Sequence, residues 1–345
     1  MHSVNREHPS LVSRRILVTL AAVVALIMAL VATPAASAVE DRVLEVEVHT
    51  GIAYTDPVPA TTQGNLLDLY IPQVPGGKPL PLIIWTSGSA WFSDNGKAGA
   101  APIAEIFNQQ RYAVAGVSVR SSFQVQFPGQ LFDIRAAVRW LRQNASDYGI
   151  DPNRIAIMGN SSGGWVSAIT ATTSDIAQLP GEPDVGNTSS GVQVAVPFFP
   201  PTDFLQMNSW YVDNPGVPSF IDHDSPTSPE SFLIGCAIQT CPNETQLANP
   251  ITYVQGSEIP IMLLHGEFDQ LVPNGQSVLL FEALADAGSS ATFISVPGAG
   301  HSVNQIIGAA DFTVFKTRAN QVQTGDSPAP SWESIEKFIS AAFSR

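Results

Sequence analysis

The chain has 345 residues, of which 44% are hydrophobic and 13% are charged, enough for one large buried core. Its formal net charge of −14 argues against nucleic acid or an anionic membrane surface as a partner. The same charge places no constraint on a neutral substrate.

The N-terminus has the features of a secretory signal. Arg14 and Arg15 precede an apolar run at 16–33, and Ala36-Ser37-Ala38 follows as a small-residue cleavage site. We therefore expect residues 1–38 to be a signal peptide cleaved after Ala38, leaving a secreted chain with no stable membrane association. The alternative is a membrane anchor, because the apolar run is just long enough to span a bilayer as a helix.

The two cysteines are Cys236 and Cys241. In an exported protein, an even number of closely spaced cysteines predicts a disulfide bond. A loop this short gains only ~2 kcal/mol in the chain-entropy description, so the bond would hold a surface loop. Two free thiols are the alternative, and a metal site is disfavoured because the sequence places no second Cys or His pair nearby.

Apolar residues along the chain predict strands that alternate with helices. Residues 43–49 and 66–71 alternate apolar and polar side chains, as half-buried strands do. Later apolar runs are continuous, which is typical of strands buried on both faces of a sheet. We expect such strands at 80–85, 112–119, 155–158, 192–198, 259–265 and 291–296, and helices at about 103–110, 128–148, 165–173, 275–287 and 331–343.

This alternation predicts an α/β fold with a mostly parallel, doubly wound sheet, since parallel strands need crossover connections. The two early strands would form an antiparallel edge. Residues 174–192 and 202–257 break the pattern and are rich in Pro, Gly, Ser and Asp. We expect them to be cap-like insertions over an active site, within a single domain that spans 39–345.

The central motif is Gly159-Asn160-Ser161-Ser162-Gly163, a G-x-S-x-G sequence between a predicted strand and a predicted helix. This is the context of a nucleophile elbow, with Ser161 exposed at the turn. The helix N-terminus would direct N–H groups and positive dipole toward an oxyanion formed there. An ordinary Gly/Ser-rich turn is the alternative.

A serine nucleophile needs a general base, and the base needs an orienting carboxylate. His301 lies in a glycine loop just after one predicted strand, and Asp269 follows the strand before it. Their order after Ser161 is the one expected for a triad on this fold. Glu267 and Asp203 are the rival acids.

Two other histidines have different expected roles. His265 ends a buried strand and is expected to be packed in the core or behind the catalytic residues. His223 lies in Asp222-His223-Asp224, which is a weak metal-ligand candidate without a further His nearby.

An oxyanion hole requires backbone N–H groups directed at the developing charge. We expect one from Ser162 and others from Gly88 and Ser89, in the loop after the strand at 80–85. A plain turn is the alternative for this loop. Three aromatic residues are candidates for lining a substrate pocket: Trp91, Trp210 and Tyr211. Exposure on the surface or packing in the core would explain these aromatic residues equally well.

Motifs between about residue 60 and the C-terminus resemble those of secreted α/β-hydrolase serine esterases. The group that they resemble most is related to hormone-sensitive lipase and to bacterial feruloyl and acetylxylan esterases. The motifs are Ser87-Gly88-Ser89-Ala90-Trp91, Phe127-Pro128, Asp133–Leu141, Tyr148-Gly149-Ile150-Asp151-Pro152, Gly159–Gly164, Pro201-Thr202-Asp203, Ser228-Pro229-Glu230-Ser231, Asn249-Pro250-Ile251-Thr252-Tyr253, His265-Gly266-x-x-Asp269-x-x-Val272-Pro273 and Gly300-His301.

The oxyanion loop departs from that family's pattern. The family usually has His-Gly-Gly-x-Trp, and here Ser87 replaces the His and Ser89 replaces the second Gly. The N–H groups of Gly88 and Ser89 remain available as donors because they belong to the main chain. A Cβ at Ser89 narrows the backbone conformations open to the loop.

The residues and the resemblance together predict a secreted serine carboxylester hydrolase for short-chain or carbohydrate-linked esters, with no cofactor or metal. Ser161 would attack the ester, His301 would accept its proton, and Asp269 would orient His301. A prolyl-oligopeptidase-like peptidase is one alternative, although the chain has no length for an N-terminal propeller. A non-catalytic hydrolase-like binding protein is the other, motivated by the altered oxyanion loop.

Overall fold

The computed structural model describes residues 43–183, 186–255, 259–318 and 321–345. The chain divides into two units, Met1–Val43 and Leu44–Arg345, and the helices and strands of the described residues all belong to the second. The expected signal peptide lies outside the described residues. Within these residues, no helix combines the length and the apolar character needed to cross a membrane.

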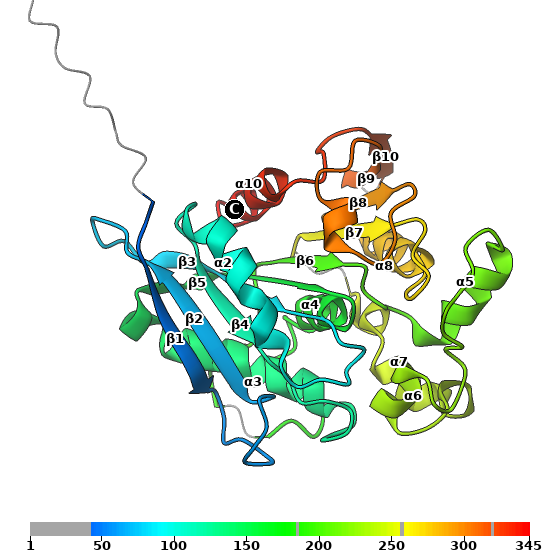
Figure 1. Ribbon diagram of the computed structural model, residues 1–345, viewed down its shortest axis with the longest axis horizontal. Helices are drawn as coiled ribbons and strands as arrows, with labels where there is room; N and C mark the ends of the chain where they lie inside the picture. The colour runs from blue at the N-terminus through cyan, green and yellow to red at the C-terminus, as the bar shows by residue number, and fades with distance from the viewer. Residues whose placement is uncertain (1–42, 184–185, 256–258, 319–320) are drawn as a thin grey trace, which may run out of the picture. The chain divides into compact units, whose positions relative to one another are not determined.

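A mixed β-sheet organises Leu44–Arg345 (Figure 1). In the described part of the chain it has ten strands in the order β1-β2-β4-β3-β5-β6-β7-β8-β9-β10. The strands are β1 (Val46–Ala53), β2 (Leu66–Pro72), β3 (Leu80–Thr86), β4 (Ala113–Val117), β5 (Ile150–Asn160), β6 (Val194–Phe198), β7 (Ile261–Gly266), β8 (Ala291–Val296), β9 (Thr313–Arg318) and β10 (Gln321–Gly325).

The middle of the sheet is parallel, from β4 through β3, β5, β6 and β7 to β8. Ile157 of β5 shows why: it pairs with Ile84 on one side and Ala195 on the other, and all three are fully buried. Continuous apolar runs suit strands covered on both faces. The predicted α/β class with a mostly parallel sheet is therefore confirmed.

Both edges of the sheet are antiparallel. The pairing of β1 with β2 and of β2 with β4 agrees with the predicted N-terminal edge. The opposite edge, where β8 pairs with β9 and β9 with β10, was not predicted. β10 gives no strand signal because all five of its residues are exposed and only Val322 is a large apolar residue.

Helices cover the two faces of the sheet. Buried apolar residues of α2 and α10 pack in one core cluster, and those of α3, α4 and α8 pack in the other. α4 is buried along its whole length and directly follows Ser161. The bounds are α2 (Ala100–Asn108), α3 (Gly129–Gln143), α4 (Ser162–Thr172), α8 (Gly275–Asp286), α9 (Val303–Ile306) and α10 (Trp332–Ala342), with 3-10 turns η1 (Gly96–Gly99) and η2 (Ala145–Tyr148).

The predicted irregular insertion at 202–257 contains short helices in its described part. The sequence does not predict these helices because an element of three to seven residues is too short to show a periodic apolar pattern. Cys236 and Cys241 form the predicted disulfide within it. The elements are η3 (Phe204–Gln206), α5 (Met207–Asp213), α6 (Pro229–Ile234), η4 (Ile238–Thr240), α7 (Pro242–Leu247) and η5 (Pro250–Tyr253).

The insertion at 174–192 is held to α3 by buried charges. Glu182 Oε1 accepts hydrogen bonds from Arg135 Nε at 2.9 Å and from Arg139 Nη1 at 2.6 Å. Its other oxygen accepts the Leu179 N–H at 2.9 Å. One carboxylate thus ties two arginines of the helix to the insertion.

Candidate active site

Ser161 occupies the turn between β5 and α4 in a strained conformation, with φ 57° and ψ −126°. Its N–H donates to the Phe198 carbonyl at 3.0 Å, and its own carbonyl accepts the Trp165 N–H at 2.9 Å. A non-glycine residue rarely adopts positive φ unless its surroundings enforce it. This geometry is that of a nucleophile elbow.

Glycines allow the elbow to pack tightly. A Cβ on Gly163 would lie 2.0 Å from the Thr86 carbonyl oxygen, and one on Gly159 would lie 2.3 Å from the Gly163 carbonyl oxygen. Both clashes are with backbone atoms, which cannot rotate away. The two glycines of the G-x-S-x-G motif are therefore required by the close approach of β5, α4 and the end of β3.

Asp269 and His301 meet at the same edge of the sheet. Asp269 follows β7, His301 follows β8, and His301 Nδ1 lies 2.7 Å from Asp269 Oδ2. Asp269 is fully buried, and its Oδ1 accepts the N–H groups of Leu271 and Val272 at 2.9 and 3.0 Å. Burial by itself would raise the pKa of this carboxyl, but hydrogen bonds from His265 and His301 hold the pKa well below its usual range.

His265 contacts the Asp269 carboxylate from the buried interior. Its Nε2 lies 3.3 Å from Asp269 Oδ2 and 3.0 Å from the Val272 carbonyl oxygen, and its Nδ1 lies 2.8 Å from Ser277 Oγ. The ring is completely buried. These contacts fix the carboxylate that in turn orients His301.

The rival acids make other contacts. Glu267 Oε1 accepts the Ser295 hydroxyl at 2.8 Å, and Asp203 caps η3 by accepting the Leu205 N–H at 3.2 Å. Of the three candidate carboxylates, the structure brings Asp269 to His301.

Ser161 and His301 both adjoin the end of β6. The Ser161 N–H is bonded to Phe198, and the ring of the next residue, Phe199, lies 4.4 Å from the His301 ring between centroids. β5, β6, β7 and β8 are consecutive in the parallel sheet, so their C-terminal ends share one edge. The tertiary structure therefore gathers residues separated by up to 140 positions.

The loop after β3 lies against the elbow. Ser89 N–H donates to Ser162 Oγ at 2.9 Å, and Gly88 N–H donates to Asn160 Oδ1 at 3.3 Å. Ser162 begins α4, where helical N–H groups lack partners within the helix. The three predicted oxyanion donors are thus close together, and two of them already donate to elbow side chains.

The serine substitutions in this loop impose no left-handed backbone at Ser89. Positive φ occurs instead at Ala90 and Trp91, at 54° and 59°. Ser87 Oγ accepts the Trp85 indole N–H at 3.0 Å. The Cβ of Ser89 therefore does not force the backbone of this residue into the left-handed region.

We expect Gly88→Ala to lower kcat at least 10²-fold. The new Cβ would lie 2.3 Å from the Asn160 carbonyl oxygen and 2.5 Å from Ser161 Cβ, so the loop must move away from Ser161. Loss of one oxyanion donor costs about 10²–10³ in kcat. Ester hydrolysis by this variant beside Gly325→Ala, where nothing lies within 4 Å of the new Cβ, measures the effect. Equal rates for the two variants would contradict the assignment.

The three candidate pocket aromatics have different surroundings. Trp91 is 4% exposed and packs edge-on at 5.5 Å against both Trp165 and Phe204. The Tyr211 hydroxyl donates to the Asp269 carbonyl at 3.1 Å, and this side chain is also buried. Trp210 is only partly buried and borders an open cavity.

Three exposed phenylalanines form a cluster that the sequence did not reveal. Phe92, Phe123 and Phe232 are 40%, 66% and 38% exposed, with ring centroids 5.3–5.8 Å apart. Phe92 follows the loop of Ser89, to whose carbonyl its N–H donates at 3.0 Å. The other two come from the segment after β4 and from α6, so no local pattern could join them.

Among the described residues, no three His, Cys, Asp or Glu side chains are grouped closely enough to hold a metal ion. His223 instead pairs with Glu230, with Nδ1 3.1 Å from Oε2, and its ring stacks on Tyr211.

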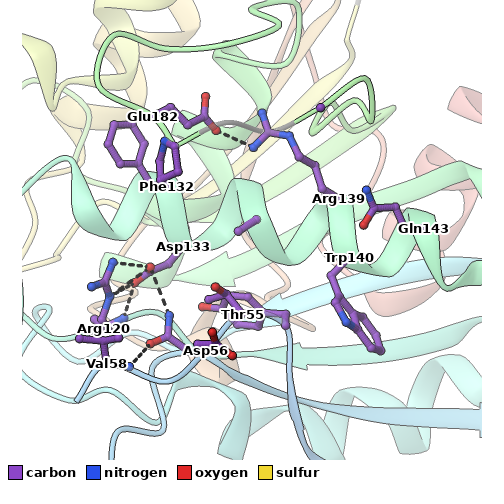
Figure 2. A pocket seen from close by; sticks show the side chains of 15 residues that line it. Thr55, Asp56, Val58, Arg120, Phe132, Asp133, Arg139, Trp140, Gln143 and Glu182 are labelled. Atoms are coloured by element: carbon purple, nitrogen blue, oxygen red, sulfur yellow. Dashed lines mark hydrogen bonds and ion pairs between the residues drawn. The ribbon is translucent and has the colours of Figure 1, made fainter. Parts of the chain in front are cut away.

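A cavity of about 590 Å³, larger than the one that Trp210 borders, lies between α3 and the segment joining β1 to β2 (Figure 2). Four charged residues of its wall are paired with one another. Arg120 binds Asp133, with Nη2 2.7 Å from Oδ1, and Arg139 binds Glu182 (Figure 2). Ser161, Asp269 and His301 do not line this cavity.

The sheet order, the elbow and the helices on both faces define an α/β hydrolase, and solved structures agree. A truncated carbohydrate esterase from gut microbiota has a TM-score of 0.68 at 28% identity, covering 87% of this chain and 97% of that one. Esterase B from Lactobacillus rhamnosis has a TM-score of 0.63 at 20% identity, covering 95% and 96%, and this likeness shows the fold alone.

The BD-FAE family model matches residues 67–284, which is more than half of the chain. The chain therefore belongs to the BD-FAE family, and the resemblance to α/β-hydrolase esterases is confirmed. Curated relatives include the esterases LipQ (28% identical, covering 72% of this chain and 57% of that one) and LipC (26%, covering 71% and 58%) of Mycobacterium tuberculosis. The chain spans less than two thirds of the length of these relatives.

Proposed function

We propose that this protein is a secreted serine carboxylic ester hydrolase acting on short-chain or carbohydrate-linked esters. The observation that carries the proposal is the 2.7 Å contact between His301 and the buried Asp269, at the sheet edge that also carries the strained Ser161. The names of the relatives support ester hydrolysis, and the carbohydrate esterase among the similar structures supports a carbohydrate-linked ester.

In the proposed mechanism, Ser161 Oγ attacks the ester carbonyl and His301 Nε2 takes its proton. Asp269 holds the Nδ1–H tautomer of His301 and stabilises the imidazolium that forms. His301 returns the proton to the departing alcohol, then activates a water that releases the acid and regenerates Ser161.

The N–H groups of Gly88, Ser89 and Ser162 would stabilise the oxyanion. Because Gly88 and Ser89 donate to Asn160 and Ser162 in the structure, the oxyanion must share or replace these bonds. Asn160 is therefore a side chain whose hydrogen bond to Gly88 would weaken or break when the transition state binds.

Hydrolysis of nitrophenyl esters graded from acetyl to long acyl tests the proposal. We expect turnover that falls as the acyl chain lengthens, and covalent labelling of Ser161 by an organophosphonate probe. Preference for long acyl chains would redirect the substrate toward lipid, and preference for peptide amides would favour the peptidase alternative. A folded protein that neither turns over esters nor reacts with the probe would favour the non-catalytic binding protein.

Secretion is part of the proposal and rests on residues 1–38. N-terminal sequencing of the protein recovered from culture medium should begin at Val39. Retention in the membrane fraction would support an anchor instead.

A further inference from the structure

A second cavity, of about 370 Å³, adjoins the loops that carry the acid and the base. Glu267 and Phe268 immediately precede Asp269, and Gly298 lies three residues before His301. Its volume falls within the range of small-molecule sites. The residues that line this Trp210 cavity are Trp210, Asn214, Val217, Glu267, Phe268, Asn274 and Gly298.

One wall of the Trp210 cavity is a fixed aromatic surface. Trp210 lies on α5, and its indole packs against the first residue of α8, Gly275, where a Cβ would come within 2.1 Å of Cε3. The glycine leaves room for the ring, which also borders the cavity. An indole already held in place loses little rotational freedom when a ligand packs on it.

The cavity lining also offers hydrogen-bond acceptors. Glu267 is exposed and uses one carboxylate oxygen to accept the Ser295 hydroxyl at 2.8 Å. A carboxylate accepts about four hydrogen bonds, so acceptor capacity remains. Asn214 donates its amide N–H to the Trp210 carbonyl at 2.9 Å, and its amide oxygen is a further acceptor.

The cavity wall is tied to the catalytic acid loop. Phe220 N–H donates to the Gln270 carbonyl at 2.9 Å, and Gln270 Nε2 donates to the Pro218 carbonyl at 3.1 Å. The Tyr211 hydroxyl donates to the Asp269 carbonyl. A ligand in the cavity would therefore be positioned relative to the reacting groups.

We propose that the Trp210 cavity binds a neutral pyranose unit of the substrate, beside the ester that is cleaved. The C–H face of such a ring packs on an indole, whose π-face is electron-rich, while its hydroxyls donate to Glu267 and Asn214. An aromatic acyl group would cover the second carboxylate oxygen of Glu267 without donating a hydrogen bond to it, and an anionic ligand would be repelled by the carboxylate. A quaternary ammonium ion would suit the indole and Glu267 but offers no donor to Asn214.

This inference rests on the proposed function for the ester, but binding can be tested without turnover. The full chain carrying Ser161→Ala would be titrated calorimetrically with xylotetraose, cellotetraose and choline. We expect at least one of the two oligosaccharides to bind, Trp210→Ala to raise its Kd at least tenfold, and Glu267→Gln to raise it several-fold. Trp140→Ala, at another partly buried tryptophan on α3, serves as the matched control and should leave Kd unchanged.

The inference would be overturned if neither oligosaccharide bound, if choline displaced the sugar, or if Trp210→Ala and Trp140→Ala behaved alike. If Trp210→Ala fails to fold, the same titration is made with Glu267→Gln and with Trp210→Phe, which keeps a flat ring. An unchanged Kd for Glu267→Gln would then overturn the inference. Nitrophenyl acetate hydrolysis by the unmodified chain separates the two proposals. Sugar binding without hydrolysis would refute only the esterase, and hydrolysis without sugar binding would refute only the subsite.

Discussion

Ser161→Ala is expected to lower kcat for nitrophenyl acetate by about 10⁴-fold or more, with little change in folding. Removal of a triad nucleophile leaves only the residual contribution of the oxyanion donors and substrate binding. Steady-state kinetics with the unmodified and variant chains measures the loss. Ser146→Ala, at an exposed serine on η2, is the matched control and should retain full activity.

The neighbouring Ser162 is not expected to replace Ser161. Its side chain is 4% exposed, and its Oγ accepts the Ser89 N–H at 2.9 Å, so the hydroxyl is directed into the oxyanion loop. A loss of less than tenfold in Ser161→Ala would mean that the nucleophile is another residue and that the proposed mechanism is wrong.

Glu182→Gln is expected to destabilise the protein by about 3–5 kcal/mol at neutral pH. The variant leaves Arg135 and Arg139 buried without their carboxylate, and breaking a buried ion pair costs this much. The midpoint of urea unfolding measures the change. Glu333→Gln, which breaks the surface pair with Lys337, is the control and should leave the midpoint unchanged.

The effect of Glu182→Gln should also depend on pH. Burial raises the pKa of the Glu182 carboxyl, but hydrogen bonds from Arg135 and Arg139 lower it more, so its pKa in the folded protein is below the ordinary value. The carboxylate therefore stabilises the fold above the unfolded pKa, about 4.3, and loses this contribution as pH falls through the folded pKa. The difference between variant and unmodified chain should shrink below about pH 4, and a constant difference would contradict the charge network.

Local sequence signals identified much of the candidate site. Ser161 lies in a motif whose glycines are needed for backbone contact, and Asp269 and His301 each follow a buried strand. Because parallel strands end at one edge of a sheet, residues after successive strands are brought together without any further signal. The sequence favours Asp269 over Glu267 as the partner of His301, and in the structure Asp269 is the carboxylate that contacts His301.

Edges and caps were less predictable. All residues of β10 are exposed and carry no periodic apolar pattern, and the helices of the insertion at 202–257 are too short to show one. Such segments take their conformation from what they pack against, as β10 does from its pairing with β9.

The sequence by itself determined the α/β class, the buried parallel strands, the elbow motif and the order of the candidate catalytic residues, because each appears as a local pattern of residues or as the order of such patterns along the chain. Only the tertiary structure decided that Glu182 joins two arginines more than 40 residues away, that His265 backs Asp269, and that Trp210 and Glu267 face one cavity. These contacts depend on how separate segments pack, and packing leaves no local pattern in the chain.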